Sequence, residues 1–215
     1  MASLNKNIKL IIFDFDGTLA DSKDFHQQGL INSLKKEGLT IKKSFINKKL
    51  GMKTTDILKG MHITNGRKIR RIFQDIDDEK TKNIRKVKLI GKTKETIRSL
   101  SRNHKLIILS NAETEFVKEV CKREKIFRYF TEIIGEQKFS TKATEIKKLL
   151  KRGNYKKNQV IFIGDRYTDV ENGEKAGIIT VAVSNKYSWS SKKDLLNQSP
   201  DFLILKIEDV IRIIN

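Results

Sequence analysis

The residues of this sequence that could do chemistry together lie in three segments, KLIIFDFDGTLADS, HKLIILSN and QVIFIGDRYTD. In each segment a run of four apolar residues, typical of a buried strand, leads into polar side chains. The polar residues are Asp14 and Asp16 in the first segment, Ser110 and Asn111 in the second, and Asp165 and Asp169 in the third. Four carboxylates, a hydroxyl and an amide could together bind a cation and a phosphate, if the fold brings them to one place.

Strands that alternate with helices are expected to position these residues. After residue 88, the apolar patterns HKLIIL, EII, QVIFI, IITVAV and DFLIL alternate with helical patterns. This alternation indicates right-handed crossovers and a parallel sheet. We therefore predict an α/β fold, a Rossmann-like parallel sheet with helices on both faces. In such sheets, ligands bind at the carboxyl ends of the strands, where the three polar motifs lie.

Residues 20–88 contain helical patterns and no convincing strand. A helix is expected over residues 22–38, and the patterns FINKKLG, TTDILKGM and GRKIRRIFQDI are also helical. We therefore predict two domains: an α/β core formed by residues 1–19 and 89–215, and a small all-helical domain formed by residues 20–88 and inserted after the first strand.

A cluster of buried carboxylates would need a cation, because unpaired charges are costly to remove from water. The oxygen ligands, with no histidine or thiolate nearby, favour Mg²⁺ over zinc. Each motif also has a simpler interpretation, because aspartates often occupy turns at strand ends and Ser-Asn pairs often cap helices. The common context favours a site: each motif ends an apolar strand and precedes a helix.

The same motifs carry a family resemblance. The segments DFDGTLADS, ILSN, FSTKATE and VIFIGDRYTD resemble, in their usual order, the four motifs of haloacid dehalogenase (HAD) superfamily phosphatases. The similarity covers essentially the whole chain. The helical insertion just after the first motif resembles the cap domain of phosphoglycolate phosphatase and β-phosphoglucomutase relatives.

The resemblance implies roles for the first motif. Asp14 is the expected nucleophile, which attacks phosphorus and forms an aspartyl-phosphate. Asp16 is the expected general acid and base, which protonates the leaving alcohol and then deprotonates the hydrolytic water. Gly17 allows the chain to turn sharply, and Thr18 holds the loop and is a candidate substrate contact.

The resemblance also implies substrate-binding residues. Ser110 and Asn111 are expected to bind substrate, with Ser110 donating a hydrogen bond to the phosphoryl group. Lys142 is expected to neutralise the charge of that group. In relatives a proline commonly follows this lysine, whereas here an alanine does, so the assignment of Lys142 rests on position. Lys138 and Lys147 are the nearby alternatives.

The metal ligands follow from the same resemblance. Asp165 is expected to bind Mg²⁺ together with Asp14 and the backbone carbonyl of Asp16. Asp169 is either a further ligand or a residue that orients the ligands, and we favour the second role. Arg166 stands where relatives often have a small residue, and it either reaches a substrate anion or points into solvent.

The predicted function is that of a Mg²⁺-dependent phosphomonoester hydrolase for a small phosphorylated metabolite, similar to phosphoglycolate phosphatase. Asp16 argues against a dehalogenase or a phosphonatase, since those members of the superfamily generally lack the second aspartate. A phosphomutase would keep both aspartates and remains an alternative. A nucleic-acid-associated protein, or a phosphatase of nucleic-acid ends, is a second alternative suggested by the charge.

Composition limits the partners. The formal net charge is +19, and residues 20–88 carry +10 of it. Lysines outnumber arginines 34 to 11 without interleaved aromatics, which favours a solvated surface over a nucleic-acid site.

No apolar run is long enough for a membrane helix, and no secretion signal is evident. The single cysteine, Cys121, suits a reducing cytoplasm, and we expect a cytoplasmic monomer or homodimer. Trp189 is expected to serve in packing.

Overall fold

The computed structural model describes residues 4, 7–49 and 51–214 of the 215-residue chain. The strands are β1 (Leu10–Phe13), β2 (Ala20–Asp21), β3 (Lys88–Leu89), β4 (Lys105–Leu109), β5 (Glu132–Ile134), β6 (Val160–Gly164), β7 (Ile179–Val183) and β8 (Phe202–Ile204). The α-helices are α1 (Lys23–Lys36), α2 (Lys43–Lys49), α3 (Thr54–Gly60), α4 (Gly66–Asn83), α5 (Thr93–Leu100), α6 (Thr114–Arg123), α7 (Lys142–Gly153), α8 (Tyr167–Ala176), α9 (Lys192–Leu196) and α10 (Asp209–Ile214). The described residues also form short 3₁₀ turns, η1 (Ile84–Lys86), η2 (Phe127–Tyr129), η3 (Glu136–Lys138) and η4 (Lys157–Gln159).

Six of the strands form one parallel sheet in the order β5-β4-β1-β6-β7-β8. Strand β1 therefore lies between β4 and β6, and Phe13 is in register with Ile108 on one side and Ile163 on the other. The three polar motifs of the sequence follow these three adjacent strands. The register places their first polar residues at one edge of the sheet.

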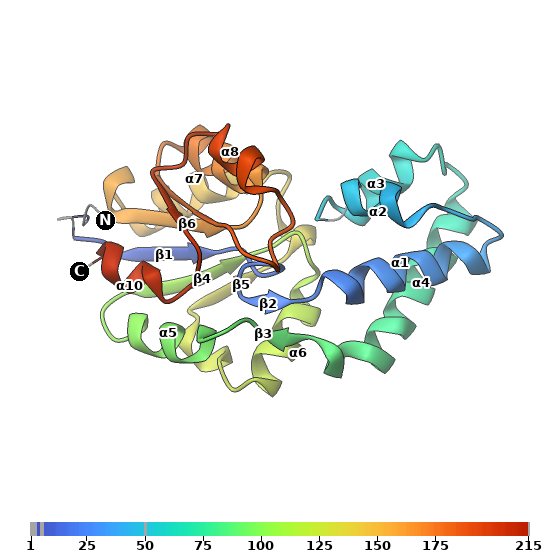
Figure 1. The fold of residues 1–215 in the computed structure, drawn as a ribbon, viewed down its shortest axis with the longest axis horizontal. Coiled ribbons are helices and arrows are strands. Elements are labelled where there is room, and N and C mark those ends of the chain that lie inside the picture. Colours follow the sequence, from blue (N-terminus) through green and yellow to red (C-terminus); the bar gives the residue numbers. More distant parts are fainter. Residues whose placement is uncertain (1–3, 5–6, 50, 215) are drawn as a thin grey trace. The chain divides into compact units, whose positions relative to one another are not determined.

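The sheet is buried on both faces, because helices cover each side (Figure 1). Alternate residues of the central strands pack toward α7 and α8 in a core cluster that includes Leu10, Ile12, Leu109 and Phe162. The intervening residues, such as Ile11, are also fully buried. Continuous apolar runs are expected for strands with two covered faces, which explains the runs in the sequence. The predicted α/β fold with a Rossmann-like parallel sheet is confirmed.

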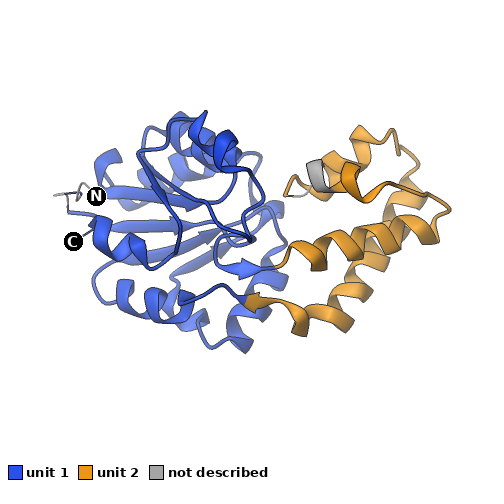
Figure 2. Cartoon of the chain, in the orientation of Figure 1, with its two compact units in different colours: residues 1–21, 89–215 blue, residues 22–88 orange. Residues whose placement is uncertain are grey.

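The chain divides into two compact units (Figure 2). Unit 1 comprises Met1–Asp21 and Leu89–Asn215, and unit 2 comprises Ser22–Lys88. The short strands β2 and β3, which the sequence did not predict, pair where the chain passes between the units. Two residues each are too few to leave a periodic pattern.

Unit 2 is helical, and its two longest helices, α1 and α4, pack against each other. Leu34 of α1 and Ile72 of α4 are fully buried. Two ion pairs also link α4 to the end of α1: Lys36 Nζ lies 2.6 Å from Asp75, and Arg71 forms two hydrogen bonds to Glu37, the residue that follows α1. These pairs are exposed and contribute little to stability compared with the buried side chains.

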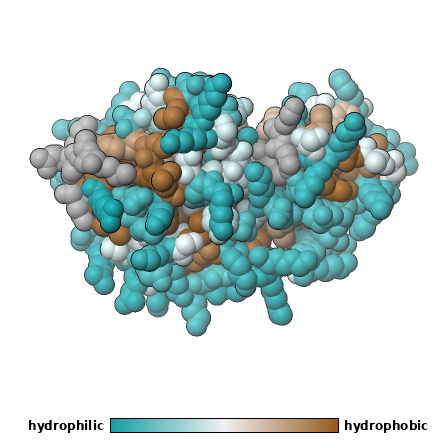
Figure 3. Space-filling model, viewed as in Figure 1, coloured by the Kyte–Doolittle hydropathy of each residue, from teal (hydrophilic) through white to brown (hydrophobic). Residues whose placement is uncertain are grey.

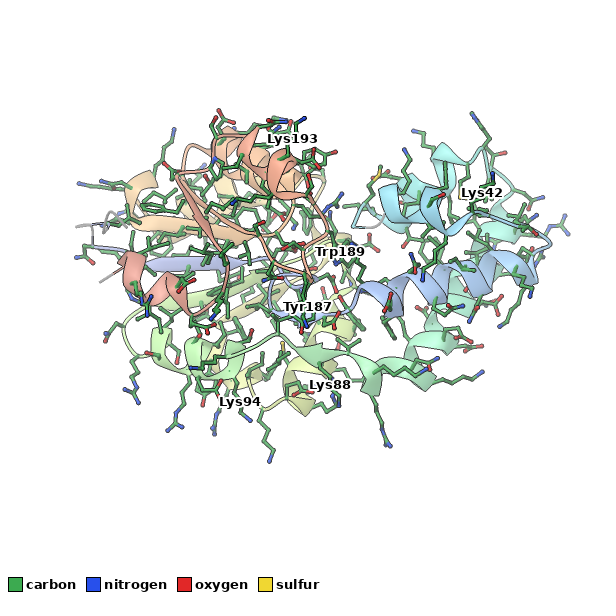
Figure 4. All side chains as sticks on the ribbon, in the orientation of Figure 1. Lys42, Lys88, Lys94, Tyr187, Trp189 and Lys193 are labelled. Carbon is green, nitrogen blue, oxygen red and sulfur yellow. The ribbon has the colours of Figure 1, made fainter. Side chains whose placement is uncertain are left out.

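Most of the surface in the view of Figure 3 is hydrophilic, although hydrophobic areas also show on it. Exposed lysines such as Lys42 of unit 2 and Lys94 and Lys193 of unit 1 extend outward (Figure 4). Among the described residues, no helix is both long and apolar enough to cross a membrane. The positive charge is thus carried largely by exposed side chains.

Candidate active site

The first polar motif forms a tight turn at the end of β1. The Gly17 N–H donates to the Ala20 carbonyl at 2.8 Å, and Gly17 has φ +80°, a conformation that glycine adopts without strain. A side chain on Gly17 would overlap Asp165. The turn buries Asp14 and Asp16, which are 4% and 8% exposed.

Asp165 follows β6 and is fully buried beside this turn. Thr18 Oγ1 donates to its Oδ1 at 2.9 Å, and the Trp189 backbone N–H donates to its Oδ2 at 2.6 Å. Thr18 therefore fixes Asp165, a contact between residues 147 apart in the sequence. The predicted role of Thr18 in holding the loop agrees with this contact, while its contact with substrate stays a prediction.

Lys142 lies between two of the buried carboxylates, Asp14 and Asp169. Its Nζ lies 2.7 Å from Asp14 Oδ1 and 2.7 Å from Asp169 Oδ1, and the residue is 5% exposed. Lys142 is the first residue of α7, which begins at a capping box made by Thr141 and Thr144. The start of this helix thus delivers the ammonium group to the end of β1.

A side chain on α8 also supports the position of Lys142. Asn172 Oδ1 accepts a hydrogen bond from the Ala143 N–H at 2.9 Å. Ala143 therefore donates a hydrogen bond that a proline at this position could not donate, because proline has no backbone N–H. Lys138 and Lys147 are both exposed, so the geometry favours Lys142 among the three candidates.

Asp169 is held from two sides. Its Oδ2 accepts the Arg166 backbone N–H at 3.1 Å, while its Oδ1 accepts from Lys142. Gly164 leaves the space that the Asp169 side chain occupies, because a Cβ there would overlap it. Arg166 is 8% exposed, so its side chain does not extend into solvent, and a contact with a substrate anion stays a prediction.

The second motif contributes a buried hydroxyl. Ser110 is 1% exposed, and its Oγ accepts the Ala112 N–H at 3.0 Å and lies 3.4 Å from Asp16 Oδ2. The Ser110 hydroxyl is the donor in its contact with Asp16, so its O–H points to the acidic side of the site. Asn111 follows Ser110 and is half-buried at the same edge.

The buried carboxylates have unusual acidity. Burial raises the pKa of Asp14 to about 7, with repulsion from Asp169 and Asp16 adding to the effect, although Lys142 opposes it. Burial and repulsion from Asp14 and Asp169 raise the pKa of Asp165 well above its usual value. Burial alone would lower the pKa of Lys142, but the carboxylates of Asp14 and Asp169 raise it overall. When all of its carboxylates are ionised, as in a metal-bound site, the group carries more negative charge than one lysine neutralises.

The site residues fit a small divalent cation. Asp14, Asp165 and Asp169 each offer one carboxylate oxygen, all within 4.8 Å of one another, and all three residues are buried. Lys142 contacts two of these carboxylates, whereas Asp165 accepts only neutral donors in the hydrogen bonds described above. A set of hard oxygen atoms with surplus negative charge is suited to Mg²⁺. The side chain of Asp16 is not one of this group of three.

The structure therefore brings Asp14, Asp16, Thr18, Ser110, Lys142, Asp165 and Asp169 to one edge of the sheet. Sequence analysis missed Asn172, which supports the start of α7, and the contact of Trp189 with Asp165. No local pattern marks Asn172, since an asparagine within a helix has no typical role. Trp189 could have been singled out as the only tryptophan of the chain.

Comparison with known proteins identifies relatives of this arrangement. The family model for haloacid dehalogenase-like hydrolases matches residues 11–183. The phosphoglycolate phosphatase of Vibrio parahaemolyticus is 21% identical over 241 residues, which cover 97% of each chain. The pyrophosphatase PpaX of Listeria monocytogenes is 29% identical over 126 residues, which cover 56% of each chain.

Solved structures agree on the fold. A haloacid dehalogenase-like family hydrolase from Streptococcus pneumoniae superimposes with a TM-score of 0.82 at 24% identity, covering 96% of this chain and 98% of that one. The match of the family model extends from the first polar motif past the third, so the predicted membership and the prediction of an enzyme are confirmed. This chain belongs to the haloacid dehalogenase-like hydrolase family.

Proposed function

We propose that this protein is a Mg²⁺-dependent phosphatase that hydrolyses a small phosphorylated metabolite through an aspartyl-phosphate on Asp14. The observation that carries the proposal is the position of Lys142 Nζ, 2.7 Å from both Asp14 and Asp169, inside a buried group with a third carboxylate, Asp165. Such a group combines a carboxylate nucleophile with positive charge for a phosphate. The name of the relative in Vibrio parahaemolyticus supports phosphoglycolate as a substrate to test.

In the first step, a carboxylate oxygen of Asp14 forms a bond to phosphorus as the bond from phosphorus to the leaving oxygen breaks. Asp16 gives its proton to that oxygen, so the substrate departs as an alcohol. Lys142 and the Ser110 hydroxyl stabilise the charge on the phosphoryl oxygens. A bound Mg²⁺ would supply further charge neutralisation and orientation of the phosphate, held by Asp14 and Asp165 and by the backbone carbonyl of Asp16.

In the second step, water attacks phosphorus and the Asp14 carboxylate is the leaving group. Asp16, now ionised, takes the proton of the water, and inorganic phosphate is released. Asp169 already orients Lys142 by hydrogen bonding, which supports an orienting role for Asp169 in preference to direct metal binding.

The helical unit is proposed to be the cap domain of this cytoplasmic enzyme, as the resemblance implies. In this proposal residues 20–88 form the cap, and residues 1–19 and 89–215 form the catalytic core, as predicted from the sequence. Among the residues of the site, all those assigned a chemical role belong to the core.

Phosphate release from a panel of phosphomonoesters tests the proposal. The panel includes p-nitrophenyl phosphate, phosphoglycolate, sugar phosphates and nucleotides, each with Mg²⁺ or with EDTA. Mg²⁺-dependent release is expected, and the highest kcat/KM indicates the substrate class. Isomerised sugar phosphate without released phosphate would instead show a mutase. Salt-sensitive binding to nucleic acid with no turnover would show a binding protein.

Replacing Lys142 by Met is expected to lower kcat/KM by roughly 10²–10³-fold, because the phosphoryl group loses a buried cation. The matched control is Lys138→Met, an exposed lysine four residues earlier, which should stay within about twofold of the wild type. Steady-state kinetics on the best substrate of the panel, with Mg²⁺ present, measures both. Equal losses in the two variants would contradict the assignment of Lys142.

Added salt is expected to lower kcat/KM roughly threefold or more from low to high ionic strength, with little change in kcat. The formal charge of +19 attracts an anionic substrate, and ions screen that attraction. The measurement is kcat/KM as a function of sodium chloride concentration, with sucrose of equal osmolality as control. A constant kcat/KM would refute electrostatic attraction of the substrate.

A further inference from the structure

The loop between β7 and α9 is held by its own hydrogen bonds and contacts Asp165, one of the buried carboxylates of the site. Ser188 Oγ donates to the Val183 carbonyl at 3.0 Å and accepts the Asn185 N–H at 2.9 Å. The Tyr187 N–H donates to Asn185 Oδ1 at 2.9 Å. These bonds close the loop on itself before Trp189, so the position of Trp189 is determined by the fold.

Trp189 contacts two parts of the active site at once. Its backbone N–H donates to Asp165 Oδ2 at 2.6 Å. Its indole Cδ1 would lie 2.7 Å from a Cβ placed on Gly17, so the ring packs directly over the turn between Asp16 and Thr18. Figure 4 shows Trp189 and Tyr187 on this loop. The ring and the backbone of one residue thus join the β1 turn to Asp165.

We propose that Trp189 is a positioning residue, which holds the Asp165 carboxylate in the orientation that binds Mg²⁺ and keeps the Gly17 turn against it. This inference rests on the metal requirement of the proposed function. It assigns to the β7–α9 loop a part in metal affinity that none of the sequence motifs indicates.

The geometry of Asp165 explains why such a residue is needed. The Asp165 carboxylate is fully buried, with one oxygen within 4.8 Å of carboxylate oxygens of Asp14 and Asp169, so when ionised it is driven to rotate away from these like charges unless it is held. Thr18 and Trp189 hold one oxygen each, which prevents that rotation and leaves lone pairs of both oxygens for a cation. Hydrogen-bond partners of metal-binding carboxylates typically change metal affinity by about 10–100-fold when they are lost.

Calorimetric titration of the metal-free protein with Mg²⁺ alone tests the proposal. Trp189→Ala removes the ring but keeps the N–H, and it should raise the Kd for Mg²⁺ about tenfold. Trp189→Phe fills much of the same space and should change the Kd by about threefold or less. Trp189→Pro removes the N–H donor and should raise the Kd at least as much as Trp189→Ala.

Tyr187→Ala is the matched control. It removes an aromatic ring from the same loop, where the ring lies beneath Lys186 with Nζ 4.9 Å from its centroid. Its Kd for Mg²⁺ should stay within about twofold of the wild type. A merely structural loop would lower the melting temperature in both variants and leave the Mg²⁺ Kd unchanged in both. That result would overturn the proposal.

Fluorescence of the wild-type protein gives a second test that needs no loop variant to fold. Trp189 is the single tryptophan of the chain, so the emission reports this loop alone. Mg²⁺ should change the emission in a saturable way, with the Kd found by calorimetry, and Asp165→Asn should abolish the change. Emission that stays constant while calorimetry records Mg²⁺ binding would overturn the proposal.

The experiments distinguish a failure of the phosphatase proposal from a failure of the proposed role of Trp189. If Mg²⁺ binds with the expected dependence on Trp189 but no phosphate is released from any substrate, the phosphatase proposal fails and the role of Trp189 stands. If wild-type protein releases phosphate and Trp189→Ala binds Mg²⁺ normally, the phosphatase proposal stands and the role of Trp189 is refuted. Absence of any Mg²⁺ binding by the wild type would overturn both.

Discussion

Replacing Asp14 by Asn is expected to lower kcat by about 10⁴-fold or more, because an amide cannot attack phosphorus as the carboxylate does. The substitution is nearly isosteric, and Lys142 keeps its second partner, Asp169, at 2.7 Å. The neutral side chain also removes one of the mutually repelling carboxylates. The variant should therefore fold, and the loss should reflect chemistry.

The measurement is steady-state phosphate release with the best substrate in saturating Mg²⁺. Asp78→Asn, which alters an exposed carboxylate on α4, is the matched control and should keep full activity within about twofold. Circular dichroism and the melting temperature establish that Asp14→Asn is folded. An Asp14→Asn protein with more than about a tenth of the wild-type kcat would exclude Asp14 as the nucleophile.

Replacing Asp165 by Asn should abolish Mg²⁺ binding and turnover, yet stabilise the metal-free protein. Burial and neighbouring carboxylates raise the pKa of Asp14 to about 7 and that of Asp165 well above its usual value. The folded state therefore holds protons that the unfolded state releases above about pH 4. Stability is lost as the pH rises through about 7, so metal-free wild type should melt higher at about pH 5 than at about pH 8.

An asparagine at position 165 removes one buried negative charge and can still satisfy its neighbours. Its amide oxygen can accept from the Trp189 N–H, and its NH₂ group can donate to the Thr18 hydroxyl. In EDTA at about pH 8 the variant should melt about 5 °C or more above the wild type, with a shallower dependence on pH.

Thermal unfolding with EDTA and with Mg²⁺ measures this prediction. Mg²⁺ should raise the melting temperature of the wild type increasingly as its concentration exceeds the Kd, and it should leave that of Asp165→Asn unchanged. The Asp78→Asn protein serves again as the control and should respond to Mg²⁺ like the wild type. Stabilisation of Asp165→Asn by Mg²⁺ equal to that of the wild type would exclude Asp165 as a ligand.

Much of the fold could be predicted from the sequence, because buried parallel strands leave continuous apolar runs. LIIF at β1, LIIL within β4 and VIFI within β6 are such runs, and their order along the chain with helices between them limits the topology. The position of Asp14, Ser110 and Asp165 at one edge followed from the same reasoning. A residue that directly follows a strand has its place fixed by that strand.

The features that the sequence did not predict depend on contacts between residues that are far apart in the chain. Lys142 could not be separated from Lys138 by spacing, since its role depends on α7 beginning at the Thr141 cap and on Asn172 across the helix pair. Trp189 follows no strand directly, and its contact with Asp165 depends on how its loop closes. Local propensity carries no information about either contact.

The most direct test of the central claim is a single-turnover experiment with enzyme in excess over the best substrate. Samples are quenched in acid over the whole time course and analysed by intact and peptide mass spectrometry. We predict that one PO₃ group appears on Asp14 and then disappears as inorganic phosphate is released, and that Asp14→Asn shows neither. Phosphate released by the wild type with no phosphoryl group on Asp14 at any time would contradict the account.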